Sequence, residues 1–350
     1  MFNEAEKQQY SRHLILDEIG EAGQLKLKQA KVLVIGAGGL GCPILQYLTA
    51  AGVGTIGIVD NDVVDASNLQ RQVLYTHEDV GTPKVLAAKT RLSALNPNIR
   101  INTYHTFLTR DNAVELFEQY DIIVDGSDNF PTRYLTNDAS ILAKKPLVFG
   151  SIFKFDGQVA VFNFNDGPSY RCLYPTPPKP NSIPNCSDIG VLGVLPGIIG
   201  TLQANETLKI ILGLGDVLSG KLLQFDALHL RQFILKFKKT EASTIEKLED
   251  NYEFFCGISE YNEITLEELE ASKDQYNLLD VRTEAEHEDE NIGGINIPIG
   301  ELLFSLEDVP TDKPLVVYCQ EGIRSKGAID LLKEKKRFDG IELINLKGGI

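Results

Sequence analysis

The sequence predicts an α/β protein made of a larger doubly wound domain and a smaller α/β domain. Two observations predict this class. In the first two thirds of the chain, short β-branched runs alternate with segments of helical spacing, which is typical of a parallel sheet covered by helices. A second, shorter series of strand and helix patterns begins at Ile264, after a charged stretch. A chain of 350 residues is also long enough to bury two separate cores.

The elements of the larger domain follow in order along the chain. Residues 1–30 are polar and predict helix. The run Lys31-Val-Leu-Val-Ile35 is continuously apolar and β-branched, which indicates a buried parallel strand. A glycine-rich turn follows it, then a helix and a second strand. Further strands are expected at 100–104, 122–125, 146–149 and 158–164, and helices at 84–95, 132–144 and 195–214.

The remainder of the chain divides into a loop, a linker and the smaller domain. Residues 175–184 hold five of the fifteen prolines, which predicts a surface loop. We expect the larger domain to span 1–245, the linker 246–262 and the smaller domain 263–350. In the smaller domain Thr265 and Glu268 form a capping-box pattern at the start of a helix. Strands are expected there at 276–280 and 315–318, and a helix at 325–335.

Composition excludes several classes of function. The net charge of −15 argues against nucleic-acid binding. We find no run of 18 apolar residues and no apolar segment of signal-peptide type near Met1, so neither a membrane span nor export is expected. The five cysteines are odd in number and scattered, which favours free thiols and a cytoplasmic location.

The turn after the first strand has the pattern of a nucleotide-binding loop. Gly36, Gly38 and Gly41 would let the backbone approach a phosphate, with the following helix presenting its N-terminal amides to the anion. Asp60 ends the second strand, where a carboxylate would accept hydrogen bonds from ribose hydroxyls. These four residues also fit a dehydrogenase that binds NAD.

The next polar segments favour a triphosphate over a dinucleotide. Arg71 and Lys84 are cations placed beyond the second strand, and such charges neutralise a phosphate group during its transfer. Asp128 follows a later strand in the run Asp125-Gly-Ser-Asp-Asn129, where a carboxylate could hold Mg²⁺. The acidic residues of this region also have structural alternatives. Asp60 and Asp65 could be turn residues at a strand end, and Asp128 could be a helix N-cap.

Taken together, these motifs resemble the MoeB/ThiF/HesA family, relatives of ubiquitin-activating enzymes. The resemblance covers about residues 4–240 and includes Arg12-His13, Gly36 to Gly41, Ser67-Asn-Leu-Gln-Arg-Gln72, Lys84 and Asp125 to Asn129. It implies adenylation of the C-terminal glycine of a small β-grasp sulfur-carrier protein ending in Gly-Gly, with ATP and Mg²⁺. It also implies a homodimer in which Arg12, otherwise a solvated charge, reaches the partner subunit's site. The expected ATP-site residues are Gly36, Gly38, Gly39, Gly41, Asp60, Ser67, Asn68, Leu69, Gln70, Arg71, Lys84, Asp128 and Asn129, with Asp128 organising Mg²⁺ and Arg71 and Lys84 contacting phosphates.

Two cysteines are placed for sulfur chemistry. Cys319 opens a seven-residue loop between a strand and a helix, where backbone amides and Arg324 would stabilise a thiolate or persulfide. With Leu278-Leu-Asp280-Val-Arg282, this segment resembles a rhodanese domain, whose C-terminal end is expected to be truncated here. Cys186 lies in the proline-rich region at the position of a family thiol that attacks the activated carboxylate; the alternative is a buried structural cysteine.

The remaining cysteines predict no metal centre. Many relatives hold structural Zn²⁺ with two C-x-x-C pairs. Here Pro175 stands where a thiol partner of Cys172 is expected, and Glu253 stands where the partner of Cys256 is expected. We therefore expect no structural zinc. Cys42 is expected to be a small packing residue at the start of a helix.

The sequence thus predicts an adenylyltransferase and sulfurtransferase. A persulfide on Cys319, loaded by a sulfur donor such as a cysteine desulfurase, would convert the adenylated carrier into a thiocarboxylate. Molybdopterin biosynthesis is the expected pathway, with thiamin and tRNA thiolation as alternatives. Two further alternatives are the NAD-dependent dehydrogenase and a non-catalytic binder of a ubiquitin-like protein.

Overall fold

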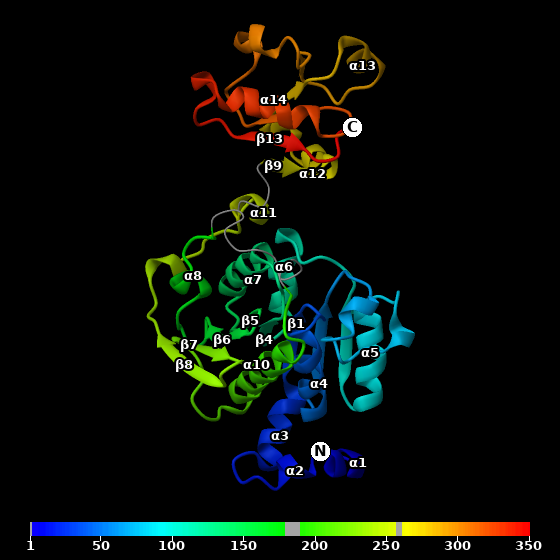
Figure 1. Cartoon of the computed structure of the whole chain (residues 1–350), viewed down its shortest axis with the longest axis vertical. Helices are drawn as coiled ribbons and strands as arrows, with labels where there is room; N and C mark the ends of the chain where they lie inside the picture. Colours follow the sequence, from blue (N-terminus) through cyan, green and yellow to red (C-terminus); the bar gives the residue numbers. More distant parts are fainter. Residues whose placement is uncertain (1, 179–189, 257–260) are drawn as a thin grey trace. The chain divides into compact units, whose positions relative to one another are not determined.

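In the computed structural model the chain forms two compact units, Met1–Tyr252 and Glu253–Ile350. The structure describes residues 2–178, 190–256 and 261–350, and each unit is described here by itself (Figure 1). The expected domain limits, at 245 and 263, remain a prediction.

The first unit contains an eight-stranded sheet in the order β3-β2-β1-β4-β5-β6-β7-β8. The strands β3 to β5 in that order pair in parallel, whereas β5, β6, β7 and β8 pair antiparallel. The sheet is therefore a doubly wound half joined to a meander. The strands are β1 (Lys31–Ile35), β2 (Thr55–Val59), β3 (Arg100–Tyr104), β4 (Ile122–Asp125), β5 (Leu147–Phe153), β6 (Asp156–Phe162), β7 (Lys221–Asp226) and β8 (Arg231–Lys236).

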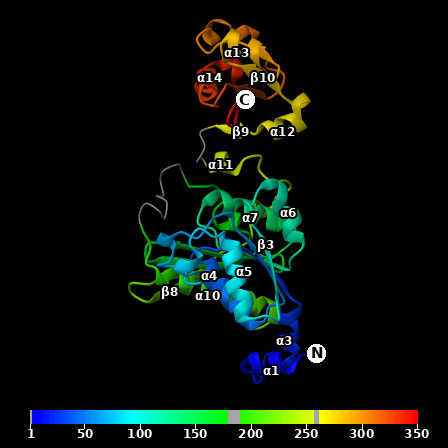
Figure 2. The same ribbon diagram turned by 90° about the vertical axis from the view of Figure 1, so that its right-hand side faces the viewer.

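Helices of the first unit fall into two packed groups. In one group α4 (Gly41–Ala51) packs against α5 (Lys84–Leu95) and α10 (Val194–Leu212); in the other, α6 (Arg110–Glu118) packs against α7 (Phe130–Leu142). The two groups are separate in Figure 2 as well. The shorter helices are α1 (Glu4–Gln9), α2 (Ser11–Leu14), α3 (Gly20–Gln29) and α8 (Tyr170–Leu173), with 3-10 turns η1 (Ala66–Asn68), η2 (His77–Asp79) and η3 (Glu241–Ser243); α11 (Tyr252–Phe255) lies at the boundary of the units.

The parallel half of the sheet positions the candidate nucleotide site. From β1 the chain moves outward through β2 to β3, then returns to place β4 on the other side of β1. This reversal makes the carboxyl ends of β1 and β4 a topological switch point, where ligands bind in open α/β sheets. The expected strands and helices of this half are confirmed. The antiparallel strands β7 and β8, and helix α6, were not predicted.

The second unit is a smaller parallel sheet in the order β11-β10-β12-β13-β9. Thr265 caps α12 by accepting from the backbone N–H of Glu268, which confirms the capping box. Cys319 directly follows β12. The strands are β9 (Asn262–Ile264), β10 (Asn277–Asp280), β11 (Ile295–Asn296), β12 (Leu315–Tyr318) and β13 (Leu343–Leu346); the helices are α12 (Leu266–Ala271), α13 (Glu284–Asp289) and α14 (Arg324–Lys333), with 3-10 turns η4 (Lys273–Gln275), η5 (Leu302–Phe304), η6 (Leu306–Asp308) and η7 (Lys336–Phe338).

Candidate active sites

The glycine-rich turn lies at the switch point between β1 and β4, and two of its positions, Gly36 and Gly41, require glycine. Gly36 has φ +87°, a conformation that side-chain-bearing residues rarely adopt. A Cβ on Gly41 would lie 2.1 Å from the carbonyl oxygen of Gly36. A Cβ on Gly39 would lie 3.2 Å from Pro196 of α10, and one on Gly38 3.5 Å from Gln72. The bare backbone of this turn is therefore open to close approach by a ligand.

Asp60 braces the glycine turn from the end of β2. Its carboxylate accepts from the backbone N–H of Ala37 at 2.7 Å and from that of Asp62 at 2.8 Å. Burial raises the pKa of Asp60, and the nearby positive charge of Lys84 acts in the opposite direction. The carboxylate is thus held beside the turn, at the position from which a ribose would be reached.

The segment after β2 brings the two expected cations to this end of the sheet. Asp65 caps η1 by accepting from the backbone N–H of Ser67, so its alternative as a turn residue is confirmed. Arg71 donates to the carbonyl oxygen of Ser67 at 3.3 Å. The Lys84 ammonium lies 2.7 Å from the Asp62 carboxylate. Asn68 and Leu69 are half-buried in this segment, and Gln70 is exposed.

The turn after β4 carries buried polar atoms that have no partner. Asp125 is 1% exposed; one carboxylate oxygen accepts from the backbone N–H of Ser127 at 2.9 Å. Its other oxygen and the Ser127 hydroxyl bond to nothing among the described residues. Asn129, not Asp128, caps α7, so the N-cap alternative for Asp128 is wrong. Asp128 is exposed in this turn.

These residues fit a nucleotide with its metal. The glycine turn provides the cradle, because its tight backbone, which a Cβ at Gly41 would displace, leads into the N-terminus of α4. The unpaired oxygens behind it, on Asp125 and Ser127, are polar groups that a bound ligand or water would satisfy. Asp128 offers the exposed carboxylate that Mg²⁺ prefers.

Two expected site residues are not brought to this switch point by the described structure. Arg12 is exposed on α2 and makes no hydrogen bond or ion pair within residues 2–178, 190–256 and 261–350. Cys186 lies outside the described residues. Their assigned roles therefore remain predictions.

In the second unit Cys319 is buried at the end of β12, with a relative exposure of 1%. Its sulfur accepts from the backbone N–H of Ser325 at 3.4 Å and lies 3.4 Å from the Ser325 hydroxyl. That hydroxyl donates to Asn345 at 2.6 Å. Burial alone would raise the pKa of Cys319, but the contacts with Ser325 and with the backbone of the loop outweigh it, so the pKa is lowered. The loop therefore favours the thiolate.

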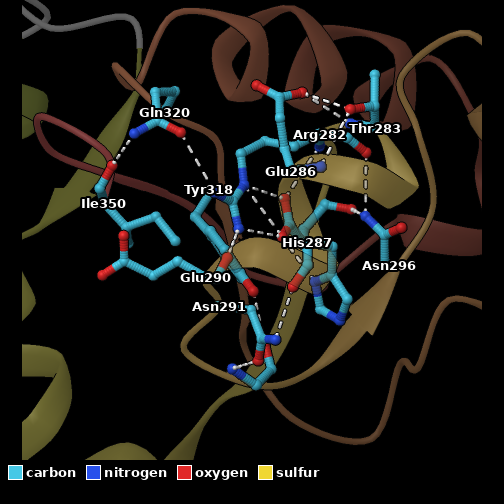
Figure 3. Close-up of polar contacts among 12 residues, drawn as sticks. Arg282, Thr283, Glu286, His287, Glu290, Asn291, Asn296, Tyr318, Gln320 and Ile350 are labelled. Atoms are coloured by element: carbon cyan, nitrogen blue, oxygen red, sulfur yellow. Dashed lines mark hydrogen bonds and ion pairs between the residues drawn. The ribbon is translucent and has the colours of Figure 1, made fainter.

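A buried ion pair supports this loop (Figure 3). Arg282, 2% exposed, holds Asp280 at 2.8 Å and also donates to Gln320, the residue after Cys319, at 3.3 Å. Gln320 in turn donates to the carbonyl oxygen of Ile350 at 2.8 Å. Sequence reasoning used Asp280 and Arg282 only as part of a motif; their contact with the loop comes from the structure.

Helix α13 adds two further contacts to the same loop. Glu286 forms an ion pair with Arg324 at 2.6 Å, and this contact, together with bonds from Thr283, lowers the pKa of Glu286. The His287 ring lies 2.8 Å from the Asp280 carboxylate and its side chain is 23% exposed. His287 is therefore half-buried and bonded to the Asp280 carboxylate beneath the loop.

The other described cysteines differ in their surroundings: burial acts to raise the pKa of Cys172, but hydrogen bonds with Ser169 and Thr240 outweigh it and lower that pKa. Cys42 is fully buried in the core of the first unit, which confirms its packing role. Cys172 accepts from the backbone N–H groups of Ser169 and Thr240, both at 3.4 Å. Cys256 is buried. Among the described residues no three His, Cys, Asp or Glu side chains form a group able to hold a metal ion.

The fold and the two sites define a nucleotide-binding α/β unit joined to a unit with an activated thiol. The chain belongs to the ThiF family, whose model matches residues 10–246. Residues 265–350 match the rhodanese-like domain.

Curated relatives match either the first unit or almost the whole chain. The sulfur carrier protein adenylyltransferase of Thermus thermophilus is 52% identical over 72% of this chain and 97% of its own length. The probable adenylyltransferase/sulfurtransferase MoeZ of Mycobacterium tuberculosis is 44% identical over 97% of this chain and 91% of its own. The probable molybdopterin-synthase adenylyltransferase of Porphyra purpurea is 41% identical, with the same two shares of 97% and 91%. No described helix is long and apolar enough to cross a membrane.

Proposed function

We propose that this chain adenylates the C-terminal glycine of a β-grasp sulfur carrier and then converts it to a thiocarboxylate. The observation that carries this proposal is the pairing, in one chain, of a glycine cradle at the sheet switch point with the thiolate-favouring loop of Cys319. Membership of the ThiF family removes the dehydrogenase alternative, and the names of relatives support both activities.

The adenylation half uses the switch point of the first unit. The glycine turn and the segment 67–71 hold ATP, with Arg71 and Lys84 on its phosphates and Asp60 on its ribose. Asp128 would hold Mg²⁺, which supplies charge neutralisation for the departing pyrophosphate. A carboxylate oxygen of the carrier bonds to the α-phosphorus while the bond to the β-phosphate oxygen breaks. The resulting acyl-adenylate has AMP as a good leaving group.

The sulfur-transfer half uses Cys319. A donor such as a cysteine desulfurase loads this thiolate with a second sulfur. The outer sulfur attacks the acyl carbon, and AMP leaves. A thiolate, for which Cys186 is the candidate, then attacks the inner sulfur; this releases the carrier thiocarboxylate and leaves a disulfide that a cellular thiol reduces. Tethering both sites in one chain raises the effective concentration of persulfide near the labile adenylate.

The proposal also includes the oligomeric state, the cellular location and the pathway of the protein. The active form is a homodimer in which Arg12 completes the partner subunit's ATP site, and the protein acts in the cytoplasm without a structural zinc. The pathway is molybdopterin biosynthesis, supported by the name of the Porphyra relative; carriers for thiamin or tRNA thiolation are the alternatives.

ATP–pyrophosphate exchange tests the proposal directly. Wild-type protein is assayed with each small Gly-Gly-ended protein encoded in the same genome, and Asp128→Ala is the matched variant. We expect exchange that depends on one carrier and that falls at least about a hundredfold in the variant. Absence of exchange with every carrier would favour the non-catalytic binder of a ubiquitin-like protein.

A further inference from the structure

Arg133 is a half-buried cation with no hydrogen-bond or ion-pair partner among the described residues. It lies in the first turn of α7, and the buried Nε atom of its guanidinium bonds to nothing among the described residues. None of its side-chain nitrogens makes a hydrogen bond or ion pair in the described part of the chain. Burying such a group without a hydrogen-bond partner costs free energy. A bound ligand that accepts a hydrogen bond from Arg133 would remove this cost.

Other arginines of the chain behave differently. Arg12, Arg100 and Arg231 also have no partner within the described residues, but all three are exposed to solvent. The well-buried Arg171 and Arg282 each hold a carboxylate within 2.8 Å. Arg133 combines partial burial with the absence of a bonded anion.

Aromatic rings hold the Arg133 guanidinium in place. Its centre lies 5.4 Å from the ring of Phe130 and 5.8 Å from that of Phe149 on β5. Such contacts attract the cation through the ring faces and leave the N–H edge able to donate. The guanidinium is thus positioned before a ligand arrives.

Its location is the side of the switch point away from the phosphate-binding cations. The charge of Arg133 lowers the pKa of both Asp125, at the end of β4, and Tyr174, although burial of each raises it more. Phe149, over which the Arg133 guanidinium lies, is the register partner of Asp125 on β4, so Arg133 lies near the carboxyl end of β4. Arg71 and Lys84 come from the loop after β2 and the first residue of α5; β2 lies two strands away from β4 in the sheet.

We propose that Arg133 binds the C-terminal carboxylate of the carrier tail and orients it toward the α-phosphorus of ATP. This inference rests on the proposed function. In-line displacement requires the attacking oxygen to approach from the side opposite the pyrophosphate, and Arg133 lies on the β4–β5 side, away from Arg71 and Lys84. A guanidinium matches a carboxylate in a planar, bidentate fashion. One carboxylate oxygen stays bonded to Arg133, which keeps its protons, while the other forms the bond to phosphorus.

The test compares two forms of one carrier. The probe is the Gly-Gly-ended protein that supports exchange, prepared with its natural C-terminal carboxylate and, by semisynthesis, with a C-terminal amide. Binding of each form to wild type and to Arg133→Met is measured by calorimetry. We expect the variant to bind the carboxylate form about tenfold or more weakly, and the amide form as wild type does. Exchange should fall in parallel, and Arg133→Lys should recover part of it.

Control measurements distinguish a specific role of Arg133 from a folding defect of the variant and from a failure of the proposed function. Arg100→Met removes an exposed, unpartnered arginine and should change neither binding nor exchange. ATP affinity of Arg133→Met should equal that of wild type, which a collapsed site would not allow. Equal weakening of both carrier forms, or a loss of ATP binding, would overturn the assignment alone. Absence of carrier-dependent exchange in wild type would overturn the proposed function and this assignment with it.

Discussion

At the scale of single residues, two buried cysteines show how neighbours set thiol chemistry. Burial disfavours a thiolate, and it raises the pKa of Cys42 to about 12. The Cys42 thiol donates to the carbonyl oxygen of Ala37, a contact that a thiolate could not make. The sulfur of Cys319 instead accepts from Ser325, and its pKa is lowered. Two thiols of similar solvent exposure therefore differ in pKa: burial dominates at Cys42, whereas hydrogen bonds outweigh it at Cys319.

The Ser325 hydroxyl can be tested through the pH dependence of Cys319. A lowered pKa keeps Cys319 ionised, and so reactive, down to a lower pH than a free cysteine. The single Ser325 hydroxyl proton goes to Asn345 in the structure and can turn toward the ionised sulfur 3.4 Å away. Removal of this hydroxyl therefore shifts the loss of reactivity to higher pH. We expect Ser325→Ala to move the alkylation midpoint upward, measured by mass spectrometry of the Cys319 peptide after iodoacetamide pulses. Ser272→Ala, in the same unit, is the control. An unchanged midpoint in Ser325→Ala would contradict this account.

At the scale of elements, the turn from β1 into α4 depends on the absence of a side chain at Gly41. A Cβ there would lie 2.1 Å from a backbone oxygen that cannot move aside cheaply. Gly41→Ala should therefore displace the cradle, and a misplacement of about 1 Å costs roughly a hundredfold in rate. The measurement is ATP–pyrophosphate exchange. Gly197→Ala, where no atom lies within 4 Å of the new Cβ, should retain exchange; equal rates in both variants would exclude this explanation.

A buried network of ion pairs and hydrogen bonds joins α7, α8 and the segment after η3. Arg171 holds the fully buried Asp138 at 2.6 Å and Glu249 at 3.1 Å, and Tyr252 donates to the same Asp138 carboxylate at 2.8 Å. These contacts draw residues 249–252, within the linker expected from the sequence, onto the first unit.

Removing the arginine should destabilise the first unit. Arg171→Met leaves the Asp138 charge buried without its cation, which typically costs about 3–5 kcal/mol. Pulse proteolysis across a urea series measures the free energy of unfolding of this unit. The control, Arg110→Met, removes an exposed ion pair with Asp250 and should cost at most about 1 kcal/mol. Similar costs in the two variants would show that Arg171 does not act as described.

At the scale of the whole molecule, two compact units divide the two chemistries. Cys319→Ala should abolish persulfide-dependent formation of the carrier thiocarboxylate and leave ATP–pyrophosphate exchange at the wild-type rate. Mass spectrometry of the carrier, together with the exchange assay, measures both on one preparation. Loss of both activities would show that the units do not work as separate modules.

The sequence by itself determined the fold class, the parallel strands and the family. Continuous apolar runs such as 31–35 and the glycines after them are local signals, because buried parallel strands and tight turns restrict residue type directly. The candidate site residues Arg71, Lys84 and Asp128 were predicted from motifs of the same local kind and remain predictions.

Only the tertiary structure decided the antiparallel half of the sheet and the supporting contacts. β8 is exposed along its whole length, so no alternation of apolar and polar residues marked it. The placement of the Arg133 guanidinium, the Ser325 bond to Cys319 and the bond of the half-buried His287 to Asp280 each depend on residues from different elements. Sequence spacing does not encode such distances, because they arise only when packing brings separate elements together.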